Sequence, residues 1–101
     1  MNEDVETSHH RDQQRYVARL GGELAGFAEY ELEGEDLVVF THTVVENAFE
    51  GRGVGGALAR FALDDVRATG ARRVVPRCEF IRGWIEKHPD YQDLVVVRPA
   101  S

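Results

Sequence analysis

Residues 50–58 read Glu50-Gly51-Arg52-Gly53-Val54-Gly55-Gly56-Ala57-Leu58, so that four glycines fall within six positions. An apolar stretch precedes this segment, and apolar residues at helical spacing follow it. The first backbone N–H groups of a helix have no intrahelical partners and lie at the positive end of the helix dipole, where they can bind an anion. Glycine permits positive φ angles and lets a ligand approach the backbone. The segment therefore predicts a strand, an anion-binding loop and a helix; the alternative is a strand-to-helix connection without a ligand.

Upstream of the loop, three stretches have the pattern of strands. Residues 37–45 are apolar on both faces, as expected for a central strand. Residues 15–20 and 23–33 alternate apolar and polar side chains on either side of a Gly21-Gly22 turn. The simplest interpretation is an antiparallel meander of three strands.

Downstream, apolar residues recur at helical spacing until Gly70 supplies a stop signal. Residues 72–76 form a β-branched run, which we expect to pair parallel to residues 37–45 through a right-handed crossover. A short second helix begins near Phe80 and ends before Pro89. Residues 94–97 either add an edge strand or dock as coil. The predicted fold class is α/β, with a mixed sheet, a parallel strand after the meander, and about two helices packed on the sheet.

Length and composition restrict the classes of function. The 101 residues suffice for one domain, which we place at residues 14–98 after a mobile polar leader at residues 1–13 that holds His9 and His10. The net charge of -6 argues against nucleic acid as a partner, and no apolar run approaches the roughly 20 residues that cross a bilayer. We expect a cytoplasmic protein without membrane contact, because no targeting segment is visible at the start.

Two further features concern ligands. Residues 52–82 hold seven arginines against three acidic residues, within an acidic chain. Such a local basic segment suits a small anionic ligand, although most of these arginines are expected to solvate helix and strand faces. Cys78 is the single cysteine, which excludes an intrachain disulfide and a metal site built on cysteine pairs. No metal ion is expected.

Several short motifs, taken together, resemble the GNAT superfamily of N-acetyltransferases. The resemblance is strongest to a short branch of roughly hundred-residue N-acetyltransferase-like proteins, and it covers about residues 15–95. The motifs that carry it are Gly22-Glu23-Leu24-Ala25-Gly26, His42-Thr43-Val44-Val45, Glu50-Gly51-Arg52-Gly53-Val54-Gly55, Val75-Pro76-Arg77-Cys78 and His88-Pro89-Asp90-Tyr91. The resemblance implies a domain that binds acetyl-coenzyme A, with the pyrophosphate on the glycine loop.

The resemblance also implies which residues bind the cofactor: Val44, Val45, Gly51, Arg52, Gly53, Val54, Gly55 and Gly56. The preferred alignment places Glu50 at the position where the superfamily usually has Gln or Arg. A carboxylate there would repel pyrophosphate, so we expect Glu50 to point away and Arg52 to face the anion. A second register, which uses Arg52, Gly55 and Ala57, would start the helix later.

Three residues are candidates for catalysis. In the implied fold, the strands at residues 37–45 and 72–76 splay apart around the thioester, with Cys78 at the mouth of the gap; the alternative is a buried cysteine that only packs. His42 alternates onto the face of Val38 and Phe40, where it is either a core histidine or a general base. Glu46 is the other candidate base, and its alternative is a solvated loop acid.

The leading functional hypothesis is transfer of acetyl from acetyl-coenzyme A to an amine, which could be a small amine, a polyamine or a lysine-containing protein. A first alternative is a non-catalytic module that binds acyl-coenzyme A. A second is an acidic adaptor that binds a basic protein and leaves the glycine loop empty. The sequence does not distinguish among these three, and it does not identify the acceptor.

Overall fold

The computed structural model describes residues 5–96 and contains a five-stranded sheet with the strand order β1-β2-β3-β4-β5. The strands are β1 Val5–His10, β2 Arg15–Leu20, β3 Glu23–Glu33, β4 Leu37–Val45 and β5 Arg73–Pro76. The helices are α1 Val54–Thr69 and α2 Glu79–Glu86, with short 3-10 helices at Arg11–Gln13, Asn47–Phe49 and Pro89–Leu94. The first four strands are antiparallel neighbours, and β5 pairs parallel to β4. The predicted α/β class with a mixed sheet is confirmed.

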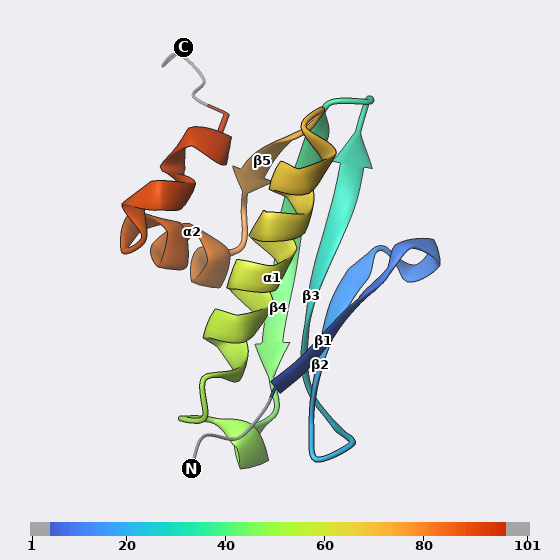
Figure 1. Cartoon of the computed structure of the whole chain (residues 1–101), viewed down its shortest axis with the longest axis vertical. Helices are drawn as coiled ribbons and strands as arrows, with labels where there is room; N and C mark the ends of the chain where they lie inside the picture. Colours follow the sequence, from blue (N-terminus) through green and yellow to red (C-terminus); the bar gives the residue numbers. More distant parts are fainter. Residues whose placement is uncertain (1–4, 97–101) are drawn as a thin grey trace.

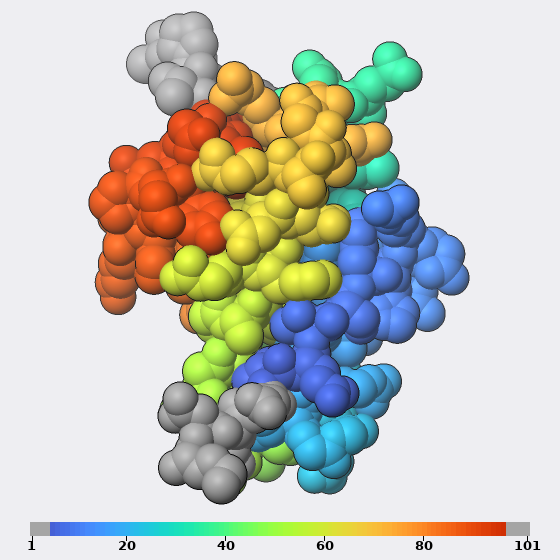
Figure 2. Space-filling view, in the orientation of Figure 1, coloured from blue at the N-terminus to red at the C-terminus, as the bar shows by residue number. Residues whose placement is uncertain are grey.

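Helix α1 covers one face of the sheet and packs against all five strands (Figure 1). Its apolar side chains recur at helical spacing and are buried: Leu58, Ala59, Ala62, Leu63 and Val66. They pack on Tyr16, Ala28 and Phe40 of the sheet. In the space-filling view, α2 and Pro89–Leu94 flank α1 on one side and β1 flanks it on the other (Figure 2). A helix that buries such a stripe against a sheet is held there mainly by the hydrophobic effect.

Residues 5–10 are a strand, and the predicted leader at residues 1–13 is wrong in this part. Strand β1 pairs antiparallel with β2 along its whole length. Its anchor is His9, whose ring stacks on Tyr16 with centroids 4.1 Å apart and whose Nε2 lies 2.6 Å from the Tyr30 hydroxyl. The His9 side chain is only 15% exposed, and its Nδ1 lies 3.0 Å from Asp65 Oδ2 of α1. His9, which was expected in a mobile leader, is therefore a packing residue, because Tyr16, Tyr30 and Asp65 supply its partners.

The last described residues, Val95 and Val96, also contact the sheet. Val95 forms an isolated parallel bridge with Val74 of β5, and the Val96 N–H donates to the Val74 carbonyl at 3.0 Å. Residues 94–97 were expected either to add an edge strand or to dock as coil. The described residues agree better with a very short edge strand, and residue 97 lies outside the described residues.

Acidification is expected to destabilise the protein through His9. Burial lowers the pKa of His9 below its ordinary value of 6.5, and this outweighs the attraction of Asp65. In the unfolded chain His9 binds a proton near pH 6.5, whereas the folded chain binds it only at lower pH, so the free energy of unfolding falls as the pH drops below about 6.5. Urea unfolding at pH 7.5 and 5.5 should show a larger loss for the wild type than for His9→Gln. His10→Gln is the matched control; an equal loss in wild type and His9→Gln would contradict this role of His9.

Candidate functional site

The glycine loop leads directly into the first turn of α1. Helix α1 starts at Val54 after Gly53, whose φ is 80°, and the Ala57 N–H donates to the Gly53 carbonyl at 3.0 Å. The N–H groups of residues 54–56 therefore precede the first intrahelical bond and are available to an anion. This start agrees with the preferred register of the loop and not with the later one.

Gly51 and Gly53 both adopt left-handed backbone conformations, with φ of 81° and 80°. A Cβ added at either position would meet no atom within 4 Å. A ligand can approach the backbone closely only where the space beside it is open, as it is next to these two glycines. Gly55 differs, because an added Cβ would lie 2.5 Å from Cζ of Phe80, so this glycine makes room for a ring of α2.

A β-bulge decides which side chains of β4 face the loop. Phe40 pairs with Tyr30, but the next pair is His42 with Glu29, so Thr41 is an extra residue on β4. The extra residue exchanges the faces of the strand beyond it. Thr43 pairs with Ala28 in the core, so Thr43 and Val45 turn toward α1, while His42 and Val44 turn to the opposite face.

Beyond the bulge, β4 also loses its neighbour β5. The parallel pairing ends at Phe40 and Pro76, and the Cys78 N–H then donates to the Phe40 carbonyl at 2.9 Å. The chain turns away into α2 at this point, while β4 continues to Val45 (Figure 1). The edge of residues 41–45 thus extends past the end of β5, as the predicted splay requires.

Loop, strand and second helix enclose one cleft of about 380 Å³. The residues that line it are Thr43, Val45, Phe49, Glu50, Gly51, Gly53, Val54, Gly55, Gly56 and Phe80. Six of the residues predicted to bind the cofactor meet here: Val45, Gly51, Gly53, Val54, Gly55 and Gly56. The other two, Val44 and Arg52, are not among the lining residues. Sequence reasoning assigned no role to Thr43, Phe49 or Phe80, which reach the cleft through the bulge, the short helix Asn47–Phe49 and the packing of α2, respectively.

The two charged residues of the loop differ in their position relative to the cleft. Glu50 lines the cleft, whereas Arg52 places its guanidinium 5.9 Å from the centre of the Phe49 ring. Phe49 itself lines the cleft, so Arg52 lies beside a lining residue, and the expected directions of the Glu50 and Arg52 side chains stay predictions.

Cys78 borders the cleft through Thr43. It immediately precedes α2, is 7% exposed, and its thiol donates to the Thr43 hydroxyl at 3.1 Å. Its neighbour Arg77 lies 3.7 Å from Glu33. The side chain is thus both part of the core and one residue away from the cleft wall, so both interpretations of this cysteine retain support.

His42 and Glu46 lie outside the cleft. The His42 side chain is 72% exposed, with Nδ1 3.8 Å from Oε1 of Glu29 on the face opposite α1. The prediction that His42 shares a face with Val38 and Phe40 is wrong, because the bulge lies between them. Glu46 is exposed after β4, and its backbone N–H donates to the Ala25 carbonyl at 2.8 Å.

Two negative findings apply to residues 5–96. They contain no group of three or more His, Cys, Asp or Glu side chains arranged to hold a metal ion. They also contain no helix of the length and hydropathy that a membrane span needs.

Comparisons with known proteins agree with this geometry. The model of the GCN5-related N-acetyl-transferase family matches residues 15–94. Protein NATD1 of Bos taurus is 31% identical over 96 residues, which is 94% of this chain and 84% of that protein; Protein NATD1 of Homo sapiens is 29% identical over the same shares.

Solved structures show the same fold. A GCN5-like protein from Staphylococcus aureus superposes with a TM-score of 0.69 at 18% identity, covering 97% of this chain and 92% of that one. A ribosomal-protein-alanine N-acetyltransferase from Brucella melitensis biovar Abortus 2308 gives a TM-score of 0.59 at 17% identity, covering 100% and 96%. The chain therefore belongs to the GCN5-related N-acetyltransferase family.

Proposed function

We propose that this protein binds acetyl-coenzyme A in the cleft beside α1 and transfers the acetyl group to an amine. The observation that carries the proposal is the meeting of three features at one cleft: the N–H groups at the start of α1, the β4 edge beyond β5, and Thr43, whose hydroxyl accepts a hydrogen bond from the Cys78 thiol. Family membership supports the reaction class.

The residues present fit the cofactor. The N–H groups of residues 54–56 can bind a pyrophosphate, and the open space beside Gly51 and Gly53 allows it to approach the backbone. The β4 edge at residues 41–45 offers main-chain groups to the amide-bearing arm, next to the half-exposed ring of Phe80. When bound, the cofactor supplies an activated acetyl thioester.

The acceptor amine must lose a proton before it attacks a thioester. His42 and Glu29 lie together on the face of the sheet opposite α1, at the level where β4 has passed the end of β5. An amine that reaches the gap from this face meets His42, so His42 is the preferred base and the exposed Glu46 is the second candidate. We expect His42→Gln to lower turnover while the affinity for coenzyme A stays the same. A lower melting temperature with normal specific activity would instead assign His42 a structural role.

The role of Cys78 has two forms, which the geometry does not separate. As an acid, the thiol would protonate the departing thiolate of coenzyme A. As a nucleophile, its sulfur would take the acetyl group, release the coenzyme A thiol, and pass the acetyl group to the amine in a second step. In both forms Thr43 orients the sulfur.

Removal of the thiol is expected to impair catalysis. Cys78→Ala should lower turnover on the order of 10²-fold, and coenzyme A should slow alkylation of Cys78 by iodoacetamide. Cys78→Ser keeps a hydroxyl next to Thr43 and separates the loss of the sulfur from the loss of packing. An acetyl label on Cys78 in intact-protein mass spectrometry would favour the nucleophile. Slow alkylation with and without the cofactor, together with normal turnover of Cys78→Ala, would leave Cys78 with a packing role alone.

The test of the proposed function combines binding with turnover. Titration with coenzyme A should release heat and raise the melting temperature by mass action, and acetyl-coenzyme A with a panel of small amines, polyamines and lysine peptides should release free thiol. Binding without thiol release across the panel would favour the non-catalytic acyl-coenzyme A module. A melting temperature that does not respond to the cofactor would favour the acidic adaptor.

A further inference from the structure

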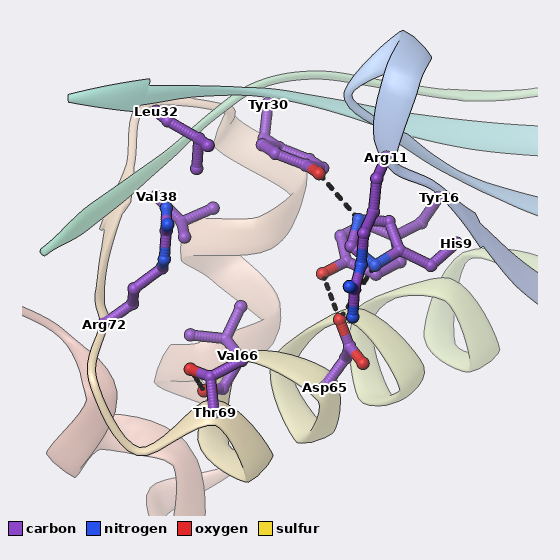
Figure 3. A pocket seen from close by; sticks show the side chains of 10 residues that line it. All are labelled: His9, Arg11, Tyr16, Tyr30, Leu32, Val38, Asp65, Val66, Thr69 and Arg72. Atoms are coloured by element: carbon purple, nitrogen blue, oxygen red, sulfur yellow. Dashed lines mark hydrogen bonds and ion pairs between the residues drawn. The ribbon is translucent and has the colours of Figure 1, made fainter. Parts of the chain in front are cut away.

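A second cavity, of about 250 Å³, lies beside the C-terminal half of α1, between this helix, the sheet and the short helix Arg11–Gln13 (Figure 3). Leu32, Val38 and Val66 supply apolar wall, and Arg11, Tyr30 and Arg72 supply polar groups. Asp65 of this cavity is ten residues along α1 from Gly55 of the glycine loop, which corresponds to about 15 Å at 1.5 Å per residue. The cavity is therefore separate from the proposed cofactor cleft.

The acidic and aromatic groups of this cavity are occupied by one another. Asp65 Oδ2 accepts a hydrogen bond from the Tyr16 hydroxyl at 2.8 Å and lies 3.0 Å from His9 Nδ1. The other nitrogen of His9 lies 2.6 Å from the Tyr30 hydroxyl. Burial raises the pKa of Tyr16 well above its ordinary value, and the hydrogen bond to Asp65 adds to this effect. The carboxylate of Asp65 is thus compensated by its neighbours, so this side of the cavity does not offer a free negative charge to a ligand.

The guanidinium of Arg72 is a separate group of this cavity. Nη1 of Arg72 is buried and has no hydrogen-bond partner among residues 5–96. A buried donor without a partner is unfavourable, and a small movement of the guanidinium toward the cavity would let an anionic ligand supply the missing acceptor. Arg72 reaches the cavity from the loop between α1 and β5, and Arg11 reaches it from the opposite side (Figure 3). Both arginines thus line the cavity, and Asp65, the single carboxylate among its lining residues, already accepts a hydrogen bond from Tyr16.

We propose that this cavity binds a small organic monocarboxylate. Its carboxylate pairs with the guanidinium of Arg72, assisted by the positive charge of Arg11, and its apolar body packs on Leu32, Val38 and Val66. A guanidinium matches the planar geometry of a carboxylate and can donate two parallel hydrogen bonds to it. The volume lies below the roughly 300–1,000 Å³ of pockets that hold drug-sized ligands, so the body is limited to a short alkyl chain or a single ring. Cationic amines are disfavoured by the two arginines.

The probe for this site is hexanoate, with hexanamide, hexylamine and inorganic phosphate as matched comparisons. Titrations followed by backbone NMR should show saturable shifts for hexanoate at residues of the cavity, and at least tenfold weaker binding of the other three. Added coenzyme A should not displace hexanoate. Shifts confined to the glycine loop, or displacement by coenzyme A, would overturn the proposal without affecting the proposed acetyl transfer. Equal binding of hexanamide or of phosphate would also overturn it, since charge and apolar body are both required.

Single substitutions test whether the guanidinium of Arg72 binds hexanoate, and control substitutions show whether a loss of binding comes from damage to the fold. Arg72→Gln should weaken hexanoate binding at least tenfold, whereas Arg19→Gln, at an exposed position of β2, should leave it unchanged. Leu32 is 41% exposed, so a polar residue is tolerated there. Leu32→Glu should abolish hexanoate binding by charge repulsion, and Leu32→Gln should retain more of it. Wild-type affinity in Arg72→Gln, or equal affinity in Leu32→Glu and Leu32→Gln, would contradict the assignment.

Discussion

Replacing Gly53 by valine is expected to abolish measurable binding of coenzyme A, with an affinity loss of at least about 100-fold. Gly53 precedes α1 with a φ of 80°, a conformation that β-branched residues essentially do not adopt. The valine would shift the start of α1, so that the N–H groups of residues 54–56 would no longer point toward one common position. The proposed anion site would then be lost. Isothermal titration with coenzyme A measures the effect directly.

The control for this variant is Gly55→Val in the same loop. Gly55 has no positive φ, and an added Cβ would collide with the end of the Phe80 ring, which can rotate away. We expect this variant to bind coenzyme A more weakly than the wild type but more tightly than Gly53→Val. Wild-type affinity in Gly53→Val would mean that the cofactor binds elsewhere.

Replacing Gly26 by valine is expected to destabilise the protein by about 3 kcal/mol or more, because it overpacks the sheet. An added Cβ at Gly26 would lie 2.6 Å from the backbone carbonyl oxygen of Val44 and 3.3 Å from Cδ1 of Leu58. The carbonyl belongs to β4, which lines the cleft, and Leu58 of α1 is fully buried, so neither can move away easily. Urea unfolding should show a lower midpoint with an unchanged slope.

Gly83→Ala provides the matched control for substitution of a glycine. Gly83 lies inside α2 and an added Cβ there would meet no atom within 4 Å. Alanine at this position should raise the free energy of unfolding by roughly 0.5–1 kcal/mol, because it lowers the backbone entropy of the unfolded chain. If Gly26→Val unfolded at the wild-type urea concentration, the close approach of β3 to β4 would not be required for stability.

The sequence alone determined the elements that carry their own periodic signals. The apolar run at residues 37–45 and the alternation at residues 15–20 and 23–33 correspond to β4, β2 and β3. The glycine loop, the stripe of α1 and the stop at Gly70 were also legible, since helix starts and stops depend on residues within a few positions of one another. These local signals were sufficient for the fold class and for the position of the glycine loop at the start of α1.

Only the tertiary structure decided which side chains meet. Strand β1 has no apolar stripe, and it is held by contacts of His9 with Tyr16, Tyr30 and Asp65, which lie far away in the sequence. The bulge at Thr41 forms between two strands, and it alone turns Thr43 toward the cleft and His42 away from it. A strand's own alternation fixes its faces only while its register with the neighbouring strand is unbroken. One extra residue, which no local sequence pattern marks, moves every side chain beyond it to the opposite face of the sheet.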